Sequence, residues 1–233
     1  ALMSNTASDN VAVGKDALFS NTNGLYNVAV GNQSLYSNIS GQSNVATGYK
    51  ALFSNTYGHV NVAIGKEALY NNTEGNSNIA ISRQALYNNT TGSSNIAIGW
   101  ESLKSNTSGN SNAATGYQAL RNNTIGSANS AMGVNSQLNT FNGNYNSSFG
   151  ALSLYFNYSG NGNSAFGYRS LHRNYSGDGN VAFGLEANPT TNLGWNNIGI
   201  GFHSLGNIET YGGRILGNEI GYDNIGLGLF AGD

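Results

Sequence analysis

Short apolar runs recur along the chain at a fixed interval and are separated by turn-forming residues. In one clear unit, residues 62–64 (Val-Ala-Ile) form the first run and residues 68–70 (Ala-Leu-Tyr) form the second. Asparagine and glycine close each run, and both favour turns because they accept a positive φ at low cost. The pattern predicts two strands of three or four residues per unit. A helix is disfavoured, because no run reaches ten residues and glycine and asparagine recur too often.

The unit repeats every 17 residues. Its most regular marker is an asparagine series, and stacked asparagines about 4.8 Å apart are expected to hydrogen-bond as a ladder. The first members of this ladder are Asn10, Asn27, Asn44, Asn61, Asn78, Asn95 and Asn112. Glycine and leucine series keep the same step. So short a period is typical of stacked coils. The predicted fold class is therefore all-β, a parallel β-solenoid (β-roll) of 17-residue coils.

The repeat also sets the expected domain organisation. Continuous coils are predicted for residues 1–205, an insertion loop for 206–223 and a final partial repeat for 224–233. Residues 1–6 echo residues 51–56, so the chain opens inside a repeat, which indicates part of something longer. Pro189 replaces the second run of its coil and predicts a loop or an edge there, because proline cannot donate to a ladder.

Neither face of the first run is polar. Val62 and Ile64 share one face, and Ala63 lies on the opposite one. A strand on the outside of a lone solenoid would show one polar face, so the alanine column is expected to lie against protein. The covering surface is either another strand of the same coil or a neighbouring chain. In the second case the oligomer interface comprises Ala12, Ala29, Ala46, Ala63, Ala80 and Ala97.

In the second run, the leucines are expected to point inward. The aromatic residues beside them form either a ladder along the outside or wedges between subunits, and exposed rings could stack on sugars. The charged insertion is a second candidate surface, because solenoid insertions often lie on the binding face; otherwise it caps the stack. The candidate ligand-binding residues are Tyr36, Tyr70, Tyr87, Glu209, Tyr211 and Arg214.

One stretch departs from the pattern of the first run. Its first position becomes small and its third position becomes large, in Ser130, Ser147 and Ser164 and in Met132, Phe149, Phe166 and Phe183. We interpret this change as compensating repacking of the interior.

Composition narrows the function classes. Charged residues make up only 9% of the chain and the net charge is -2, so no basic field for nucleic acid is expected, and the lysines and arginines are scattered along the sequence. No apolar stretch approaches the ~20 residues of a membrane span, so no membrane insertion is expected. No signal peptide is visible. The absence of cysteine excludes disulfides and thiolate chemistry.

No catalytic site, metal site or cofactor is predicted, and an enzyme is the least favoured class. Histidines His59, His172 and His203 share no ligand spacing. Glu67 and Glu101 lie two coils apart in one column, and a solvated edge is favoured over the convergent carboxylate pair of a glycosidase. A calcium-binding β-roll would need aspartates that repeat in the turns.

Asn-x-Ser/Thr motifs recur in the turns. They would be glycan acceptors in a secreted eukaryotic protein and are otherwise turn residues. They begin at Asn38, Asn71, Asn89, Asn106, Asn122, Asn157 and Asn174.

The unit Asn-(Val/Ile)-Ala-Ile-Gly-x-x-Ala-Leu-Tyr-x-Asn-Thr-x-Gly-x-x resembles two related sets of proteins. Its core, at residues 61–65 and 95–99, resembles the strand signature of trimeric autotransporter adhesin heads. The full unit is similar to repeats in bacteriophage tail fibres and related surface fibres. The resemblance covers about residues 1–205 and returns at 224–228. It implies left-handed parallel β-rolls that form homotrimers around a shared apolar axis.

The leading hypothesis is a non-catalytic structural and adhesive fibre segment. It would be homotrimeric, located at a cell surface or on a virion tail, and would contact a cell-surface glycan or protein receptor. Two alternatives stay open: a self-assembling extracellular filament, and a glycan- or ice-binding solenoid. The threonines that an ice-binding face would need form only a partial array: Thr22, Thr56, Thr73, Thr90, Thr107 and Thr124.

Overall fold

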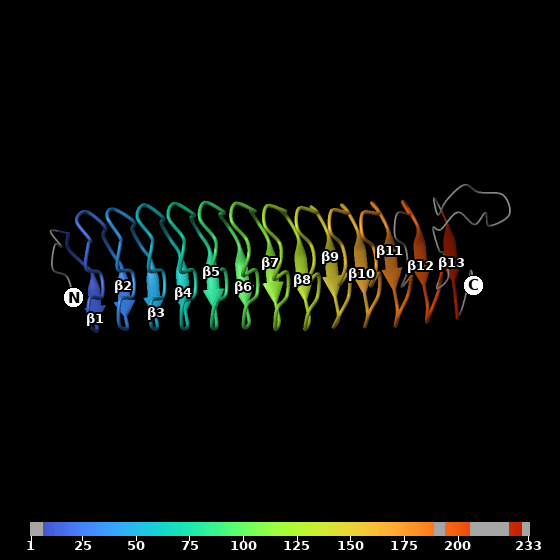
Figure 1. Cartoon of the computed structure of the whole chain (residues 1–233), viewed down its shortest axis with the longest axis horizontal. Helices are drawn as coiled ribbons and strands as arrows, with labels where there is room; N and C mark the ends of the chain where they lie inside the picture. The colour runs from blue at the N-terminus through green and yellow to red at the C-terminus, as the bar shows by residue number, and fades with distance from the viewer. Residues whose placement is uncertain (1–6, 189–193, 206–223, 230–233) are drawn as a thin grey trace. The chain divides into compact units, whose positions relative to one another are not determined.

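The computed structural model describes residues 7–188, 194–205 and 224–229. The chain divides into two compact units, Ala1–Thr115 and Gly116–Asp233. In both units the described coils each contribute one three-residue strand, and the described residues contain no helix (Figure 1).

The strands follow one another at the repeat interval. The first unit contains β1 (Val11–Val13), β2 (Val28–Val30), β3 (Val45–Thr47), β4 (Val62–Ile64), β5 (Ile79–Ile81), β6 (Ile96–Ile98) and β7 (Ala113–Thr115). The second unit contains β8 (Ser130–Met132), β9 (Ser147–Phe149), β10 (Ser164–Phe166), β11 (Val181–Phe183), β12 (Ile198–Ile200) and β13 (Ile225–Leu227).

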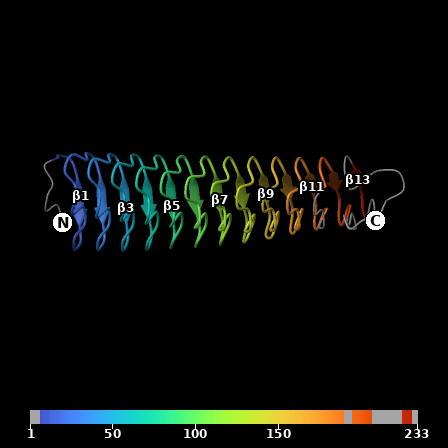
Figure 2. The same ribbon diagram turned by 45° about the horizontal axis from the view of Figure 1, so that its top comes forward.

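Neighbouring strands within each unit are parallel and in register. Between β4 and β5, for example, Ala63 lies opposite Ala80 and Ile64 lies opposite Ile81. The strand of each coil therefore stacks beside the strand of the next, as Figure 2 shows from a second direction. The predicted all-β parallel solenoid of 17-residue coils is confirmed.

The prediction of a second strand in each coil is wrong. Residues 65–71 and their equivalents, which we call the curl, form consecutive turns. Glu67 and Leu69 both have positive φ values, 56° and 52°, so the chain bends where a strand would extend. The curl still pairs with its neighbours: the Leu69 amide donates to the Ala85 carbonyl at 2.9 Å, and the Glu67 amide to the Tyr49 carbonyl at 2.9 Å. These contacts satisfy the backbone without a second strand.

The turn into the curl requires glycine. Gly65 has a φ of 131°, and a Cβ atom there would lie 2.7 Å from the carbonyl oxygen of Ser82 in the next coil. Such close stacking of backbone on backbone leaves no room for a side chain.

The interior of each coil is narrow. In the coil of β4 it holds Ala63 from the strand and Ala68 and Leu69 from the curl, all fully buried. Leucine points inward, as predicted. Two asparagines, Asn61 and Asn72, are equally buried beside them. The interior of one chain is therefore filled by its own side chains.

Candidate functional site

The alanine column lies inside the chain. Ala29, Ala46, Ala63, Ala80 and Ala97 are fully buried by their own coils, and Ala12 is half-buried. They pack within a single copy, so the predicted oligomer interface at these alanines is wrong. The alternative that the same coil covers them is correct.

The first and third side chains of every strand point outward instead. We call them the outward sheet face of each unit. In the first unit it comprises Val11, Val13, Val28, Val30, Val45, Thr47, Val62, Ile64, Ile79, Ile81, Ile96, Ile98, Ala113 and Thr115. None of these side chains is fully buried, and Ile64 is 40% exposed. Parallel sheets are normally covered on both faces, and contiguous exposed apolar surface marks an interaction site.

The outward sheet face of the second unit carries the departure noted in the sequence. Ser147 and Ser164 stand beside Phe149 and Phe166 on this face, so the substitutions change the surface and do not repack the interior. The rings of Phe149 and Phe166 stack with centroids 5.0 Å apart. Phe183 continues the row at 5.7 Å from Phe166 and is 58% exposed. These large exposed phenyl rings extend the contiguous apolar surface that is typical of an interaction site.

The predicted asparagines form a ladder that is fully buried from Asn27 to Asn112, whereas Asn10 is half-buried. Asn61 donates its backbone N–H to Oδ1 of Asn44 at 2.9 Å and its side-chain amide to the carbonyl of Gly75 at 2.9 Å. Asn78 repeats this geometry on Asn61. These residues hold the coils together and offer no polar group to a ligand.

A second asparagine ladder was missed by the sequence reasoning. Asn72 donates its amide to Oδ1 of Asn55 at 2.8 Å and to the carbonyl of Gly75 at 3.0 Å. The column contains Asn21, Asn38, Asn55, Asn72, Asn89, Asn106, Asn123, Asn157 and Asn174. This second ladder could have been found in the sequence, because its asparagines recur at the same 17-residue step as those of the first ladder.

This second ladder limits glycan attachment. Five of the Asn-x-Ser/Thr asparagines, namely Asn38, Asn89, Asn106, Asn157 and Asn174, are fully buried in it. Asn71 and Asn122 are only partly buried, and each donates its amide to the asparagine one coil further on. Only these two of the seven predicted acceptors therefore reach the surface of the folded chain.

The aromatic residues of the curl form a stacked ladder. The rings of Phe19, Tyr36, Phe53, Tyr70 and Tyr87 follow one another at centroid distances of 5.1 Å. Burial, followed by the charge of Glu67, raises the pKa of the Tyr87 hydroxyl. A sugar ring stacks on an aromatic face. Because each face is covered by the next ring, Tyr36 and Tyr70 present only their edges to a ligand.

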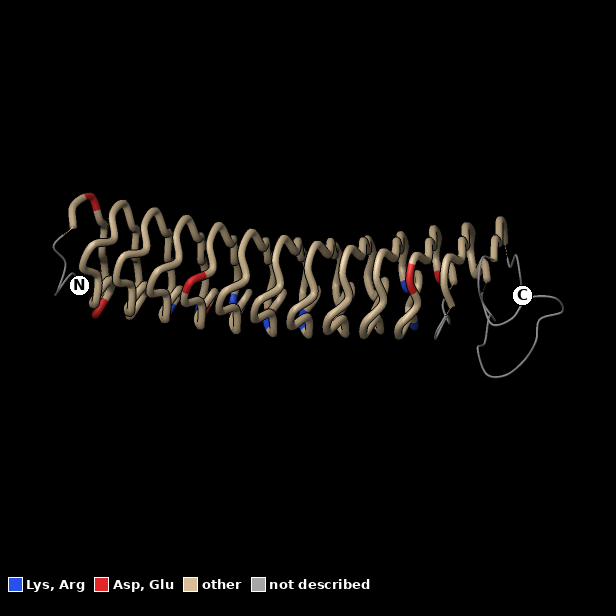
Figure 3. The backbone as a smooth tube through the Cα atoms, turned by 90° about the horizontal axis from the view of Figure 1, so that it is seen from above, with Lys and Arg blue, Asp and Glu red and all other residues tan. Residues whose placement is uncertain are grey.

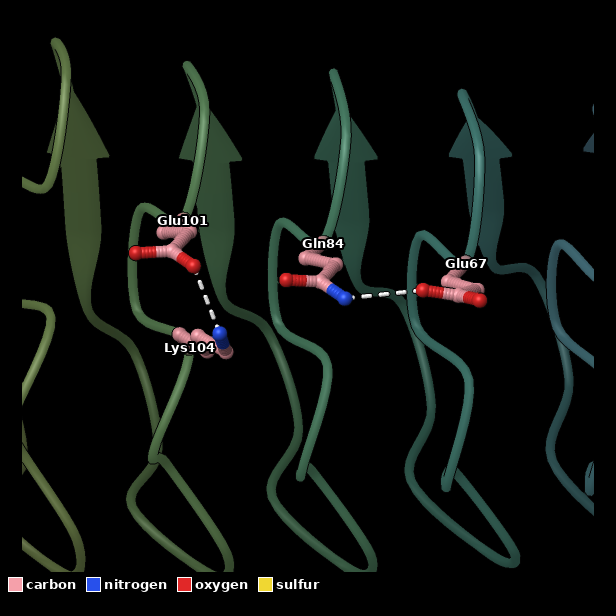
Figure 4. Close-up of polar contacts among 4 residues, drawn as sticks. All are labelled: Glu67, Gln84, Glu101 and Lys104. Atoms are coloured by element: carbon pink, nitrogen blue, oxygen red, sulfur yellow. Dashed lines mark hydrogen bonds and ion pairs between the residues drawn. The ribbon is translucent and has the colours of Figure 1, made fainter.

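Glu67 and Glu101 lie in one column of the curl (Figure 4). Gln84 stands between them in this column and donates to Glu67 at 2.8 Å. Lys104 lies 2.6 Å from Glu101. The Gln84–Glu67 contact links two neighbouring coils, and the Lys104–Glu101 contact lies within one coil.

Charge is not scattered over the folded chain. Every lysine and arginine of the first unit lies in a curl, and Figure 3 marks several of them in blue along one edge of the coils. They are Lys15, Lys50, Lys66, Arg83 and Lys104. Three acids of this unit, Asp16, Glu67 and Glu101, also lie in curls, whereas Asp9 and Glu74 lie in the turns that precede and follow the strand and curl. The coil gathers cations that the linear sequence keeps apart.

The histidines do not converge. His59 accepts a hydrogen bond from the Gln42 backbone at its Nδ1, 3.0 Å away. His203 contacts Glu186 at 2.7 Å, and His172 stacks on Tyr155. Within the part of the chain that the structure describes, no group of three His, Cys, Asp or Glu residues could hold a metal ion.

The remaining candidate residues, Glu209, Tyr211 and Arg214, lie outside the described residues, as does Pro189. No helix with the length and apolar character of a membrane span occurs among the residues described. A scan against protein-family models finds no match, and a search of curated proteins finds no relative.

Proposed function

We propose that this chain is a non-catalytic structural and adhesive fibre segment that associates with copies of itself. The observation that carries the proposal is the outward sheet face, which is mostly apolar and accessible along the strands of both units. Burying apolar surface stabilises association by about 25 cal/mol per Å². A long row of Val, Ile and Phe side chains therefore favours a partner of similar length and flatness, and a second copy has both.

The resemblance to adhesin heads and phage tail fibres supports three copies, left-handed coils and a place at a cell surface or on a virion tail. The outward sheet face would supply the exposed apolar side chains that form such a shared axis. In this arrangement the sheets face one another at the centre and the curls remain on the outside. The fibre would then present its curls to a cell-surface glycan or protein receptor.

Sedimentation equilibrium tests the proposal. We expect a mass three times the 24.3 kDa of the single chain. The variant Val62→Glu/Ile79→Glu places two carboxylates on the outward sheet face and should shift the protein to the single-chain mass. The matched control Ser77→Glu/Ser94→Glu adds the same charge to exposed turns and should leave the assembly intact. A wild-type protein that sediments as a monomer at micromolar concentration would contradict the proposal.

The alternatives make different predictions. A filament would appear as long polymers in electron micrographs. An ice-binding face needs hydroxyl groups that are available to water, whereas Thr56 and Thr73 donate their hydroxyls to backbone carbonyls of the next coil at 3.1 and 3.2 Å. The fibre segment is therefore favoured over the ice-binding solenoid.

A further inference from the structure

Three cations lie in consecutive coils of the first unit. Lys50 belongs to the curl after β3, Lys66 to the curl after β4 and Arg83 to the curl after β5. Coils in a parallel ladder are about 4.8 Å apart, so these curls form a closely spaced row. We call Lys50, Lys66 and Arg83 the cation row.

Aromatic rings hold the cation row in place. The Lys50 and Lys66 ammonium groups lie 5.4 and 5.7 Å from the ring centroid of Tyr49, one from the same curl and one from the next. The Arg83 guanidinium lies 5.4 Å from the ring centroid of Trp100. Contacts between cations and rings at this range are attractive and limit the freedom of long side chains. A hydrogen bond to Tyr49 raises the pKa of Lys50, which keeps its charge at neutral pH.

The nearby acids neutralise only part of this charge. Glu101 pairs with Lys104, outside the cation row, and Glu67 lies 3.9 Å from Lys66 while it accepts a hydrogen bond from Gln84. Among the residues that the structure describes, neither Lys50 nor Arg83 has a carboxylate partner. The row therefore carries a net positive charge to which an anionic ligand can bind.

We propose that the cation row binds an acidic polysaccharide, a chain of sugars that bear carboxylate or sulfate groups. This inference rests on the proposed adhesive function and names the chemical class of its partner. A single exposed ion pair contributes little. A row of cations one coil apart therefore suits a polymer with repeating anions, because several weak pairs then form together.

Nucleic acid fits the same surface less well. Binding of single strands depends on bases that stack on open aromatic faces. The stacked ladder of the curl covers its own ring faces, and Tyr49 and Trp100 already carry cations.

The test compares binding of polygalacturonate, neutral dextran and single-stranded oligo-dT by the full chain at low and moderate salt. The variant Lys50→Gln/Lys66→Gln/Arg83→Gln removes three positive charges from the row. The matched control Ser43→Asp/Ser77→Asp/Ser94→Asp lowers the net charge equally at exposed turn positions with φ near 57–60°. Aspartate tolerates this backbone conformation, so both variants should fold, as circular dichroism would show.

We expect polygalacturonate to bind, with an affinity that falls as salt rises. The cation-row variant should lose at least tenfold in affinity and most of the salt dependence, and the control less than threefold. Equal losses in both variants, equal binding of dextran, or tighter binding of oligo-dT would each overturn the inference. Sedimentation of the same samples separates the two proposals: a monomer that binds polygalacturonate overturns only the assembly, and a trimer that does not bind overturns only the cation row.

Discussion

Asn61 donates two hydrogen bonds to a single oxygen of Asn44, one from its backbone N–H at 2.9 Å and one from its side-chain amide at 3.1 Å. Both residues are fully buried, so one amide oxygen replaces two water molecules that the unfolded chain would use. The same relationship passes from coil to coil. A buried polar group is tolerated only where it is paired, and here the period guarantees the pairing.

The first prediction concerns this ladder. Asn61→Ala removes the amide that contacts Asn44 and Gly75 and leaves the backbone N–H of Asn78 without its acceptor. Because buried groups then stay unpaired, we expect a loss of about 3 kcal/mol in the free energy of unfolding. Urea denaturation measures it. The control Asn76→Ala removes an exposed asparagine, whose side-chain oxygen accepts from the backbone N–H of His59 at 2.8 Å, and should lose less than about 1 kcal/mol. Equal losses would show that burial of the ladder is unimportant.

The second prediction concerns Ser82, which stands where other coils have glycine. Its φ is 109°, in a region that residues with a side chain rarely adopt. Strain of this kind costs roughly 1–3 kcal/mol, so Ser82→Gly should raise the unfolding free energy by about 1 kcal/mol. The reverse change, Gly65→Ser, should destabilise, because a Cβ atom there meets backbone at 2.7 Å. If both substitutions destabilise, the serine makes a favourable contact that outweighs its backbone strain.

The fold was predictable from sequence because the backbone geometry of the coil requires particular residue types, and these residue types recur at the repeat interval. Glycine at Gly65 and asparagine at Asn61 each mark a place where one residue type fits the stack. The second strand was mispredicted for a physical reason. Leu69 is apolar, yet its φ of 52° turns the chain, and an apolar pattern does not predict the backbone dihedral angle.

The orientation of the strand was not predictable from its pattern. Alternation in Val62-Ala63-Ile64 separates two faces, but both are apolar, so no polar residue indicates which one meets water. The cation row was hidden for another reason. Lys50, Lys66 and Arg83 stand far apart in the linear sequence, and only the stacking of coils brings neighbours such as Lys50 and Lys66 to the same ring of Tyr49. A search at the repeat spacing, rather than for runs, would have found Lys66 and Arg83 but not Lys50, because the residue one period after Lys50 is Glu67.

The third prediction concerns a polar cluster inside the second unit. Gln137 occupies a buried position where most coils have leucine, and it donates to Oγ of Ser148 at 2.9 Å and to the carbonyl of Ser130 at 3.0 Å. Its Oε1 is buried and has no hydrogen-bond partner among the described residues. The double variant Gln137→Leu/Ser148→Ala restores the apolar pair of other coils, and we expect it to gain about 1–3 kcal/mol.

Each single variant should gain less than the double variant. Gln137→Leu leaves the Ser148 hydroxyl with only Ser136 Oγ as a partner, and Ser148→Ala leaves the Gln137 amide with only the carbonyls of Ser130 and Asn146 while its Oε1 stays buried and unpaired. A double-mutant cycle in urea measures the coupling between the two sites. Strict additivity would show that the two side chains act independently, in conflict with the 2.9 Å contact.

The last prediction concerns pH. Burial, followed by the charges of Arg169 and Arg173, lowers the pKa of His172 from 6.5 to about 4, while Glu186 acts weakly in the opposite direction. The folded state thus binds a proton less readily than the unfolded state. Stability is therefore complete above pH 6.5 and falls as the pH drops toward 4, where the unfolded histidine is protonated and the folded one resists it.

His172→Phe keeps a ring to stack on Tyr155, which lies 5.3 Å from His172, and removes the titrating group. The difference in unfolding free energy between the variant and the wild type should therefore widen in favour of the variant as the pH falls from 7.5 to 4. Carboxylates such as Glu186 titrate in both proteins, so most of their effect cancels in this difference. Parallel pH profiles for the two proteins would mean that His172 is protonated as easily in the folded chain as in the unfolded one, and that its burial is relieved by local opening of the curl.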